Sequence, residues 1–184
     1  MQKIILSGTW KMRTVGESDW IPAQVPGSAW TDFIREGIEE DPYVSDRHFD
    51  VFERFRRDYE YERTFKLAEE MLEADRLELI CEGLDTIAEI YINDQFVAAT
   101  KNMHRTYRFD VKRVVQSGEN TIRIIFRSPV HYVEEKQKER YLWAANGDYV
   151  VQGFPHLRNA HHMFGWDWGP KLPDSGMWRD IYLC

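Results

Sequence analysis

The chain has 184 residues, of which 43% are hydrophobic and 30% charged, and its formal net charge is −7. A chain of this length can bury a core without disulfides or metals, and no stretch approaches the roughly 20 apolar residues of a membrane-spanning helix. The acidic balance disfavours nucleic acid and anionic membrane surfaces, because phosphate groups attract basic proteins. Uncharged ligands are compatible with this charge.

The two cysteines and the first residues bear on the cellular compartment. Cys81 and Cys184 are far apart in sequence and form neither a metal-binding nor a redox motif. The apolar run Ile4–Leu6 is too short for the core of a signal peptide. We therefore expect two free thiols and a cytoplasmic protein, unless a longer leader precedes this sequence in its parent.

The first predicted element is a short helix over residues 29–36. Ser28 is a favourable N-cap, and Gly37 is suited to the C-terminal end. Short strands with alternating apolar residues are predicted farther on, at 59–67, 76–83, 87–94, 96–100, 106–114, 121–128 and 177–183. The pair Asn93-Asp94 tolerates positive φ and predicts a hairpin turn between two of them.

Helices are minor in this pattern. Ser128-Pro129 predicts an N-cap followed by a mostly solvated helix over 130–141. Seven or more short strands separated by turns are typical of a β-sandwich or barrel, not of alternating β-α units. Residues 143–173 are rich in Gly, His, Asn and Trp and have little periodicity. Such a long irregular segment is usually functional, or else it contains helices or strands that the pattern does not reveal.

The segment LRNAHHMFGWDWGP (157–170) contains the residue types that bind sugars. Aromatic rings cover the apolar C–H faces of a pyranose, and a carboxylate can accept hydrogen bonds from two neighbouring hydroxyls. The candidates are Arg158, Asn159, His161, His162, Trp166, Asp167 and Trp168. In the alternative interpretation the tryptophans belong to the core and Asp167 caps a turn. A metal site built from the three nearby histidines has no demonstrated convergence of ligands, so no metal or cofactor is expected.

Motifs along nearly the whole chain are similar to one enzyme family. They are GTWKM (8–12), VPGS (25–28), DPY (41–43), EGLDT (82–86), GENTIRIIF (118–126) and above all LRNAHHMFGWDWGPKLPDSGMWRDIYL (157–183). The sequence resembles the N-terminal domain of the glycoside hydrolase family that contains β-galactosidase, β-glucuronidase and β-mannosidase. The FGWDWGP motif, with Arg158 nine residues before Asp167, is similar to the β-mannosidase branch in particular.

The resemblance implies an all-β fold, a jelly-roll sugar-binding β-sandwich with minor helices over residues 1–184. It implies an immunoglobulin-like domain and a TIM-barrel catalytic domain downstream, with the barrel as an intramolecular partner and mannose-containing oligosaccharides as ligands. Asp167 would accept hydrogen bonds from the substrate, Trp166 would line the site, and Arg158 and His162 would contribute to it. The resemblance further implies that Trp168 is a packing residue and that His104 is a core substitution.

The catalytic carboxylates are expected elsewhere. Retaining glycosidases use two carboxylates about 5–5.5 Å apart, and in this family both lie on the barrel, which needs about 250 residues. None of the 31 acidic residues has a matching motif. We therefore expect an inactive substrate-binding domain of a β-mannosidase-like enzyme. An autonomous carbohydrate-binding module, the same domain of an exo-β-glucosaminidase, and a purely structural domain remain alternatives.

Overall fold

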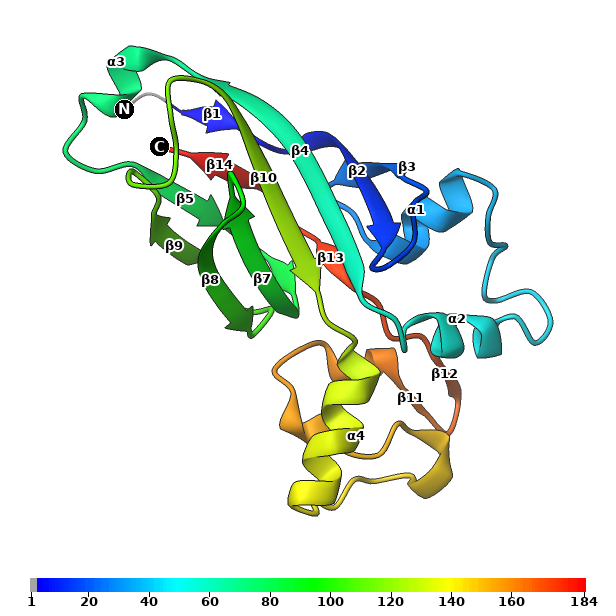
Figure 1. Ribbon diagram of the computed structural model, residues 1–184. Coiled ribbons are helices and arrows are strands. Elements are labelled where there is room, and N and C mark those ends of the chain that lie inside the picture. Colours follow the sequence, from blue (N-terminus) through cyan, green and yellow to red (C-terminus); the bar gives the residue numbers. More distant parts are fainter. Residues whose placement is uncertain (1–2) are drawn as a thin grey trace.

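A computed structural model describes residues 3–184 (Figure 1). Its larger sheet has six antiparallel strands in the order β3-β2-β4-β10-β7-β8. The bounds are β2 Gly8–Thr14, β3 Ile21–Val25, β4 Tyr59–Leu67, β7 Ile87–Ile92, β8 Gln95–Lys101 and β10 Gly118–Phe126. The strands predicted at 59–67, 87–94 and 96–100 are confirmed in this sheet, as is the hairpin turn, with Asn93 and Asp94 at positive φ between β7 and β8.

A second sheet of four strands packs against the first (Figure 1). Its order is β1-β14-β5-β9, with β1 Ile4–Ile5, β5 Glu78–Cys81, β9 Tyr107–Asp110 and β14 Ile181–Leu183. Two small sheets complete the fold: β6 Leu84–Asp85 pairs with β13 Gly176–Met177, and β11 Phe164–Trp166 pairs with β12 Gly169–Lys171. The β-sandwich prediction is thereby confirmed.

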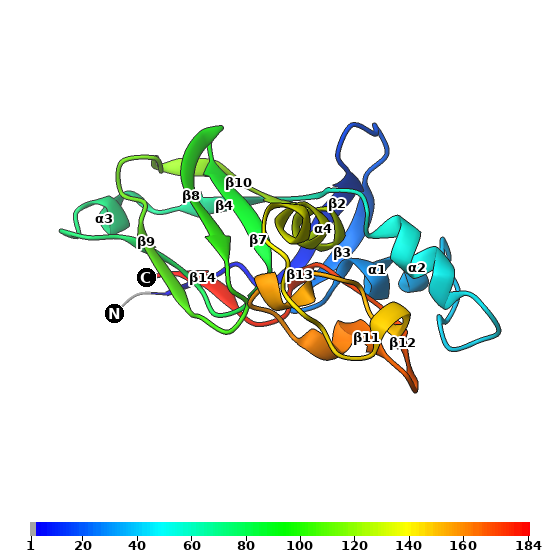
Figure 2. The same cartoon turned by 90° about the horizontal axis from the view of Figure 1, so that it is seen from below.

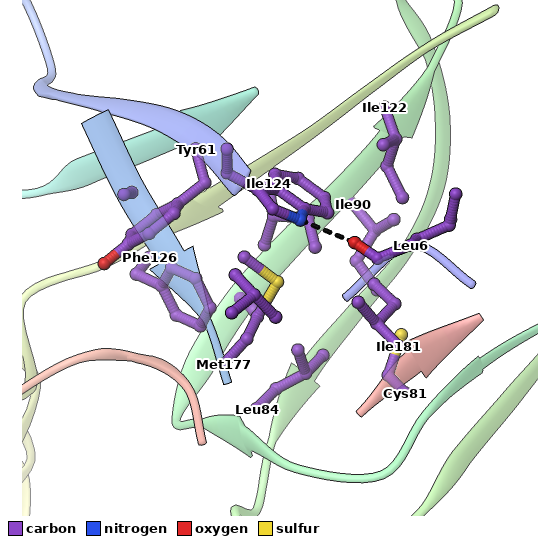
Figure 3. Packing of buried hydrophobic residues seen from close by; sticks show 14 of the residues in the cluster. Leu6, Tyr61, Cys81, Leu84, Ile90, Ile122, Ile124, Phe126, Met177 and Ile181 are labelled. Carbon is purple, nitrogen blue, oxygen red and sulfur yellow. Dashed lines mark hydrogen bonds between the residues drawn. The ribbon is translucent and has the colours of Figure 1, made fainter. Parts of the chain in front are cut away.

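The main core lies between the two large sheets (Figure 3). Ile90, Ile124 and Phe126 come from the six-stranded sheet, and Leu79 and Ile181 come from the other. All five side chains are buried, because alternate residues of each strand point to the same face. The burial of apolar surface between the sheets is the main stabilising contribution.

Charged residues on the outer face of the six-stranded sheet are held in ion pairs. Glu60 is buried, and Arg13 and Arg123 both pair with its carboxylate, at 2.7 and 3.2 Å. Arg127 bonds both Glu89 and Asp58. These ion pairs offset the hydration that the charged groups lose when the strands partly bury them.

Two helices begin at the predicted caps. In α1 (Ala29–Arg35) the Ser28 hydroxyl accepts from the Thr31 amide, and Gly37 follows with a φ of +68°. In α4 (Pro129–Glu139) the Ser128 hydroxyl accepts from the His131 amide at 3.1 Å. Two further helices, α2 (His48–Arg54) and α3 (Glu69–Leu72), were not predicted, because each buries a single residue and shows no apolar repeat.

Two predictions about individual segments are wrong. The single strand at 177–183 is split into β13 and β14, because Trp178 turns away to cover Gly83, where an added Cβ would lie 2.6 Å from the Trp178 Nε1. His104 is exposed and is no core substitution, since its backbone amide turns back to the Asn102 side chain at 3.0 Å.

The hairpin of β11 and β12 lies at the end of the molecule opposite to both chain ends (Figure 1 and Figure 2). Helix α2 lies beside it at the same end. Within residues 3–184 no helix is long and apolar enough to cross a membrane. Cys81 is buried among the core residues, where burial raises the pKa of its thiol, and it is not bonded to Cys184.

Candidate functional site

The FGWDWGP motif forms the short β11–β12 hairpin. Phe164 pairs with Lys171, and Trp166 pairs with Gly169, so Asp167 and Trp168 form a two-residue tip. The motif is therefore both strand and loop: its ends are paired, and its centre is presented outward. A tip of only two residues is the shortest common connection between antiparallel strands, and it holds its side chains on a stiff support.

The hairpin rests on a second apolar cluster, separate from the main core. This cluster contains Val133, Val151, Leu157 and Phe164, all buried. Phe164 is the hairpin's contribution to it and stacks on Phe154 with ring centroids 6.3 Å apart. Val133 comes from α4, whose remaining faces are largely in solvent, so the predicted solvated helix is also the support of the hairpin.

Gly165 allows the hairpin to approach the preceding segment closely. Its φ is +93°, and a Cβ there would lie 2.5 Å from the Tyr149 carbonyl oxygen and 2.8 Å from the Lys171 Cγ. Only glycine fits this position without displacement of the backbone. The Val151 amide donates to the Phe164 carbonyl at 2.8 Å, and the Lys171 ammonium donates to the Asp148 carbonyl, also at 2.8 Å. The 148–151 segment thus holds both strands of the hairpin.

The three central side chains of the motif face solvent. Asp167 is exposed, as are Trp166 at 42% and Trp168 at 83% of their surface. The two indole rings lie 6.4 Å apart at an angle of 55°. The interpretation of the tryptophans as core residues is therefore wrong for both, and so is the prediction that Trp168 is a packing residue. The large exposed fraction of Trp168 is available for contact with another molecule or domain.

Two cavities flank the hairpin. The first, which we call the large cavity, has a volume of about 940 Å³ and is lined by His161, His162 and Asp174 among others. The second, which we call the Asp167 cavity, has a volume of about 700 Å³ and lies between the hairpin tip and α2. Three aromatic residues, Tyr43, Trp166 and Trp168, line both cavities. Both volumes fall within the range of about 300–1,000 Å³ that is typical of small-molecule sites.

The four predicted substrate-binding residues are not gathered in one place. Asp167 lines the cavity named after it, and His162 lines the large cavity on the other side of the hairpin. Trp166 lines both cavities. Arg158 lines neither of the two: its side chain is exposed, and its backbone carbonyl accepts a hydrogen bond from the Met103 amide at 2.9 Å.

The histidines near the hairpin have separate surroundings. The His156 Nε2 lies 2.9 Å from the Arg140 carbonyl oxygen, whereas the His161 Nε2 lies 2.9 Å from the Leu157 carbonyl oxygen, so each ring donates to its own backbone acceptor. Within the described residues 3–184 no group of three His, Cys, Asp or Glu side chains is placed to hold a metal ion.

Asp174 is a polar group of the large cavity that the sequence did not reveal. Its Oδ1 accepts hydrogen bonds from the backbone amides of Ser175 at 2.7 Å and Trp30 at 3.2 Å, which joins the end of the hairpin segment to the first turn of α1. Burial raises its pKa to about 7, and the nearby Asp85 carboxylate adds to the effect. The pKa of this carboxyl group is therefore well above the ordinary value of an aspartate.

Two aromatic residues of the Asp167 cavity were also missed as site residues. Tyr43 belongs to the DPY motif, where the Asp41 side chain accepts from the Tyr43 backbone amide at 2.9 Å in a tight turn. Phe49 lies in the first turn of α2, with its ring 4.2 Å from that of His48. Both residues are more than a hundred positions from the hairpin in sequence, so only the fold brings them to it.

The fold and this site define a class of protein. The fold is a sandwich of antiparallel sheets, with the aromatic and acidic hairpin at one end (Figure 1). The family model described as the glycosyl hydrolase 2 galactose-binding domain-like family matches residues 10–179. The chain belongs to this family.

Within this family, β-mannosidases are among the proteins to which the chain is similar. The chain is 34% identical to β-mannosidase of Capra hircus, over 98% of this chain and 21% of the relative, and 31% identical to β-mannosidase A of Aspergillus aculeatus, over 95% of this chain and 19% of the relative. The solved structure of β-D-mannosidase from Dictyoglomus thermophilum is similar with a TM-score of 0.92 and 33% identity, over all of this chain and 22% of the other. This chain therefore spans about a fifth of the length of these relatives.

A more distant similarity concerns the fold alone. The exo-chitosanase of Amycolatopsis orientalis is similar over the whole of this chain with a TM-score of 0.70, at 14% identity and over 20% of the other chain. The same sandwich therefore occurs in proteins whose described activities differ.

Proposed function

We propose that this chain is the substrate-binding N-terminal domain of a β-mannosidase-like glycoside hydrolase, which removes terminal β-mannosyl residues from oligosaccharides. The observation that carries the proposal is the exposed Asp167 carboxylate at the tip of a stiff hairpin, between two exposed tryptophans. The family membership and the β-mannosidase relatives support the choice of enzyme.

In this proposal the hairpin residues have distinct roles. Asp167 accepts hydrogen bonds from two neighbouring hydroxyls of the terminal sugar, and such charge-assisted bonds are stronger than neutral ones. Trp166 covers an apolar face of the sugar ring. His162 contributes from the large cavity. Arg158 acts as a positioning residue, since its backbone carbonyl holds the start of the segment against Met103.

The bond cleavage itself is assigned to polypeptide beyond this chain. Glycoside hydrolysis needs two carboxylates on opposite sides of the scissile bond. We propose that they lie on a downstream barrel, next to an immunoglobulin-like domain, and that the barrel forms the rest of the pocket around Asp167. The isolated domain is then inactive and binds mannose weakly, because it provides only part of the contacts.

The test uses the full-length gene product and an aryl β-mannoside. Asp167→Asn keeps the size of the side chain but removes the charge, and it should lower kcat/KM by about 10- to 100-fold, as expected for loss of a charge-assisted bond of about 1.5–3 kcal/mol. The matched control is Asp94→Asn, at the two-residue tip of the β7–β8 hairpin. It should leave activity within about twofold. Unchanged activity of the Asp167 variant with an intact fold would refute the role.

The same preparation separates the alternatives. Hydrolysis of an aryl β-glucosaminide in preference to the β-mannoside would assign the domain to an exo-β-glucosaminidase. Calorimetry on residues 1–184 with mannobiose distinguishes an autonomous module, which would bind saturably with micromolar to millimolar affinity, about −4 to −8 kcal/mol. Such binding, abolished by Asp167→Ala, would overturn the proposal that the pocket needs the barrel.

A further inference from the structure

The Asp167 cavity has more exposed aromatic side chains than a single sugar ring bound to Asp167 would contact. Among residues 3–184, eight Phe, Tyr and Trp side chains are exposed, and five of them line this cavity: Tyr43, Phe49, Tyr149, Trp166 and Trp168. The others lie outside it. Monomeric proteins rarely gather exposed apolar groups without a binding function. These five residues come from three segments, which the fold brings together.

The chemistry of the cavity suits an uncharged, hydroxyl-rich ring. Aromatic faces pack against C–H groups, and Asp167, His48 and Asp148 offer acceptors and donors at its edge. Its volume of about 700 Å³ exceeds what one ring held at Asp167 occupies. The remaining space is bounded by Tyr43 and Phe49, which stand across the cavity from the hairpin on the segment that contains α2.

We propose that Tyr43 and Phe49 bind the sugar unit on the leaving-group side of the scissile bond in a neutral, β-linked oligosaccharide. This inference rests on the proposed function, because Asp167 must hold the terminal sugar for the next ring to reach α2. The cavity is continuous from the hairpin tip to α2, so two linked rings occupy it end to end. The two aromatic residues then determine the preference for oligosaccharides over simple glycosides.

The support beneath Phe49 keeps this wall in place. Helix α2 packs against β12. One turn after Phe49, the Phe52 ring packs against the guanidinium of Arg56, which lies 5.0 Å from the ring centre. Phe49 itself is 64% exposed and packs beside His48. Its removal therefore should not affect folding, whereas it removes one face of the cavity.

The experiment compares two substrates in the full-length gene product. β-Mannobiose has a leaving sugar that reaches α2, and methyl β-mannoside has none. Phe49→Ala should lower kcat/KM for mannobiose about three- to tenfold, the effect of one lost aromatic contact, and leave the methyl glycoside within about twofold. Tyr43→Ala should show the same selectivity. Phe49→Tyr keeps the ring and should keep the mannobiose rate.

The matched control is Phe96→Ala in β8, because Phe96 is 58% exposed and lies outside the Asp167 cavity. It should leave both substrates unchanged. Equal losses on both substrates for Phe49→Ala would indicate that a neighbouring domain covers this surface, and would overturn the inference. So would an unchanged rate with mannobiose.

The Asp167→Asn variant separates this inference from the function on which it rests. If that variant loses activity on both substrates while Phe49→Ala shows no selectivity, the proposed function stands and the leaving-group site is wrong. If Asp167→Asn keeps full activity, both proposals are overturned.

Discussion

Replacing Asp174 with asparagine should change how the stability of the domain depends on pH. Burial raises the pKa of this carboxyl group to about 7 in the folded protein, against about 3.9 for an unperturbed aspartate. The folded state therefore binds the proton more tightly than the unfolded state. Between about pH 4 and pH 7 the folded state holds more protons, so the free energy of unfolding falls as the pH rises through this window.

The size of the effect follows from the separation of the two pKa values. Each unit corresponds to 1.36 kcal/mol, so a separation of about three units gives an upper limit of roughly 4 kcal/mol. Between about pH 5 and pH 8 the expected loss is on the order of 2 kcal/mol. Asp85 acts with the same sign, because burial raises its pKa to about 6. Asp174→Asn should therefore remove much of the pH dependence in this interval, but not all of it.

Urea unfolding of residues 1–184 at several pH values measures this directly. Asparagine keeps an Oδ1 acceptor for the Trp30 and Ser175 amides and removes only the titration, so Asp174→Asn should be more stable than the wild type at about pH 8. The control is Glu78→Gln. The hydrogen bond from Arg108 lowers the pKa of Glu78. The stabilising effect of Glu78 is therefore lost only as the pH falls through that lowered pKa, below the interval of the test. An unchanged slope between pH 5 and pH 8 in Asp174→Asn would refute the reasoning.

Three further substitutions test how the hairpin and its support are built, and a fourth, Gly16→Ala, is the control for the first. Gly165→Ala should destabilise the domain by more than about 2 kcal/mol, because its Cβ would clash with the Tyr149 carbonyl. Gly16 has a φ of +91° and lies in open space, so Gly16→Ala should cost only about 1–2 kcal/mol in the same unfolding assay. Phe164→Ala should cost about 3–5 kcal/mol because Phe164 is fully buried, and a cost below 1 kcal/mol would contradict the second cluster. Trp168→Ala, by contrast, should leave the melting temperature unchanged.

The sequence predicts most of the sandwich because each strand has its own local signal. In β4 the alternation of buried Tyr61, Phe65 and Leu67 with polar residues identifies the strand without any knowledge of its neighbours. The capping residue Ser28 marks the start of α1 in the same way. Helix α2 has only Val51 buried, so its packing against the hairpin has no periodic trace in the sequence.

The candidate site is only partly accessible to sequence reasoning. The motif identifies Trp166 and Asp167 because they lie side by side in the chain. Tyr43 and Phe49 belong to the same cavity through tertiary contacts between distant segments, which no local pattern encodes. The raised pKa of Asp174 likewise depends on burial. The sequence alone does not distinguish a buried aspartate from an exposed one.

The division of the apolar residues into two clusters has a consequence for the motions of the domain. The hairpin is anchored by Phe164 in a small cluster with Val133, Val151 and Leu157, while the two large sheets share the main core. A few buried side chains give a lower opening free energy than a large core does. Backbone amides of β11 and β12 should therefore exchange with deuterium through a local opening that leaves β4 and β10 protected. The part of the domain that we propose contacts sugar can thus open locally while the sandwich that carries it stays folded.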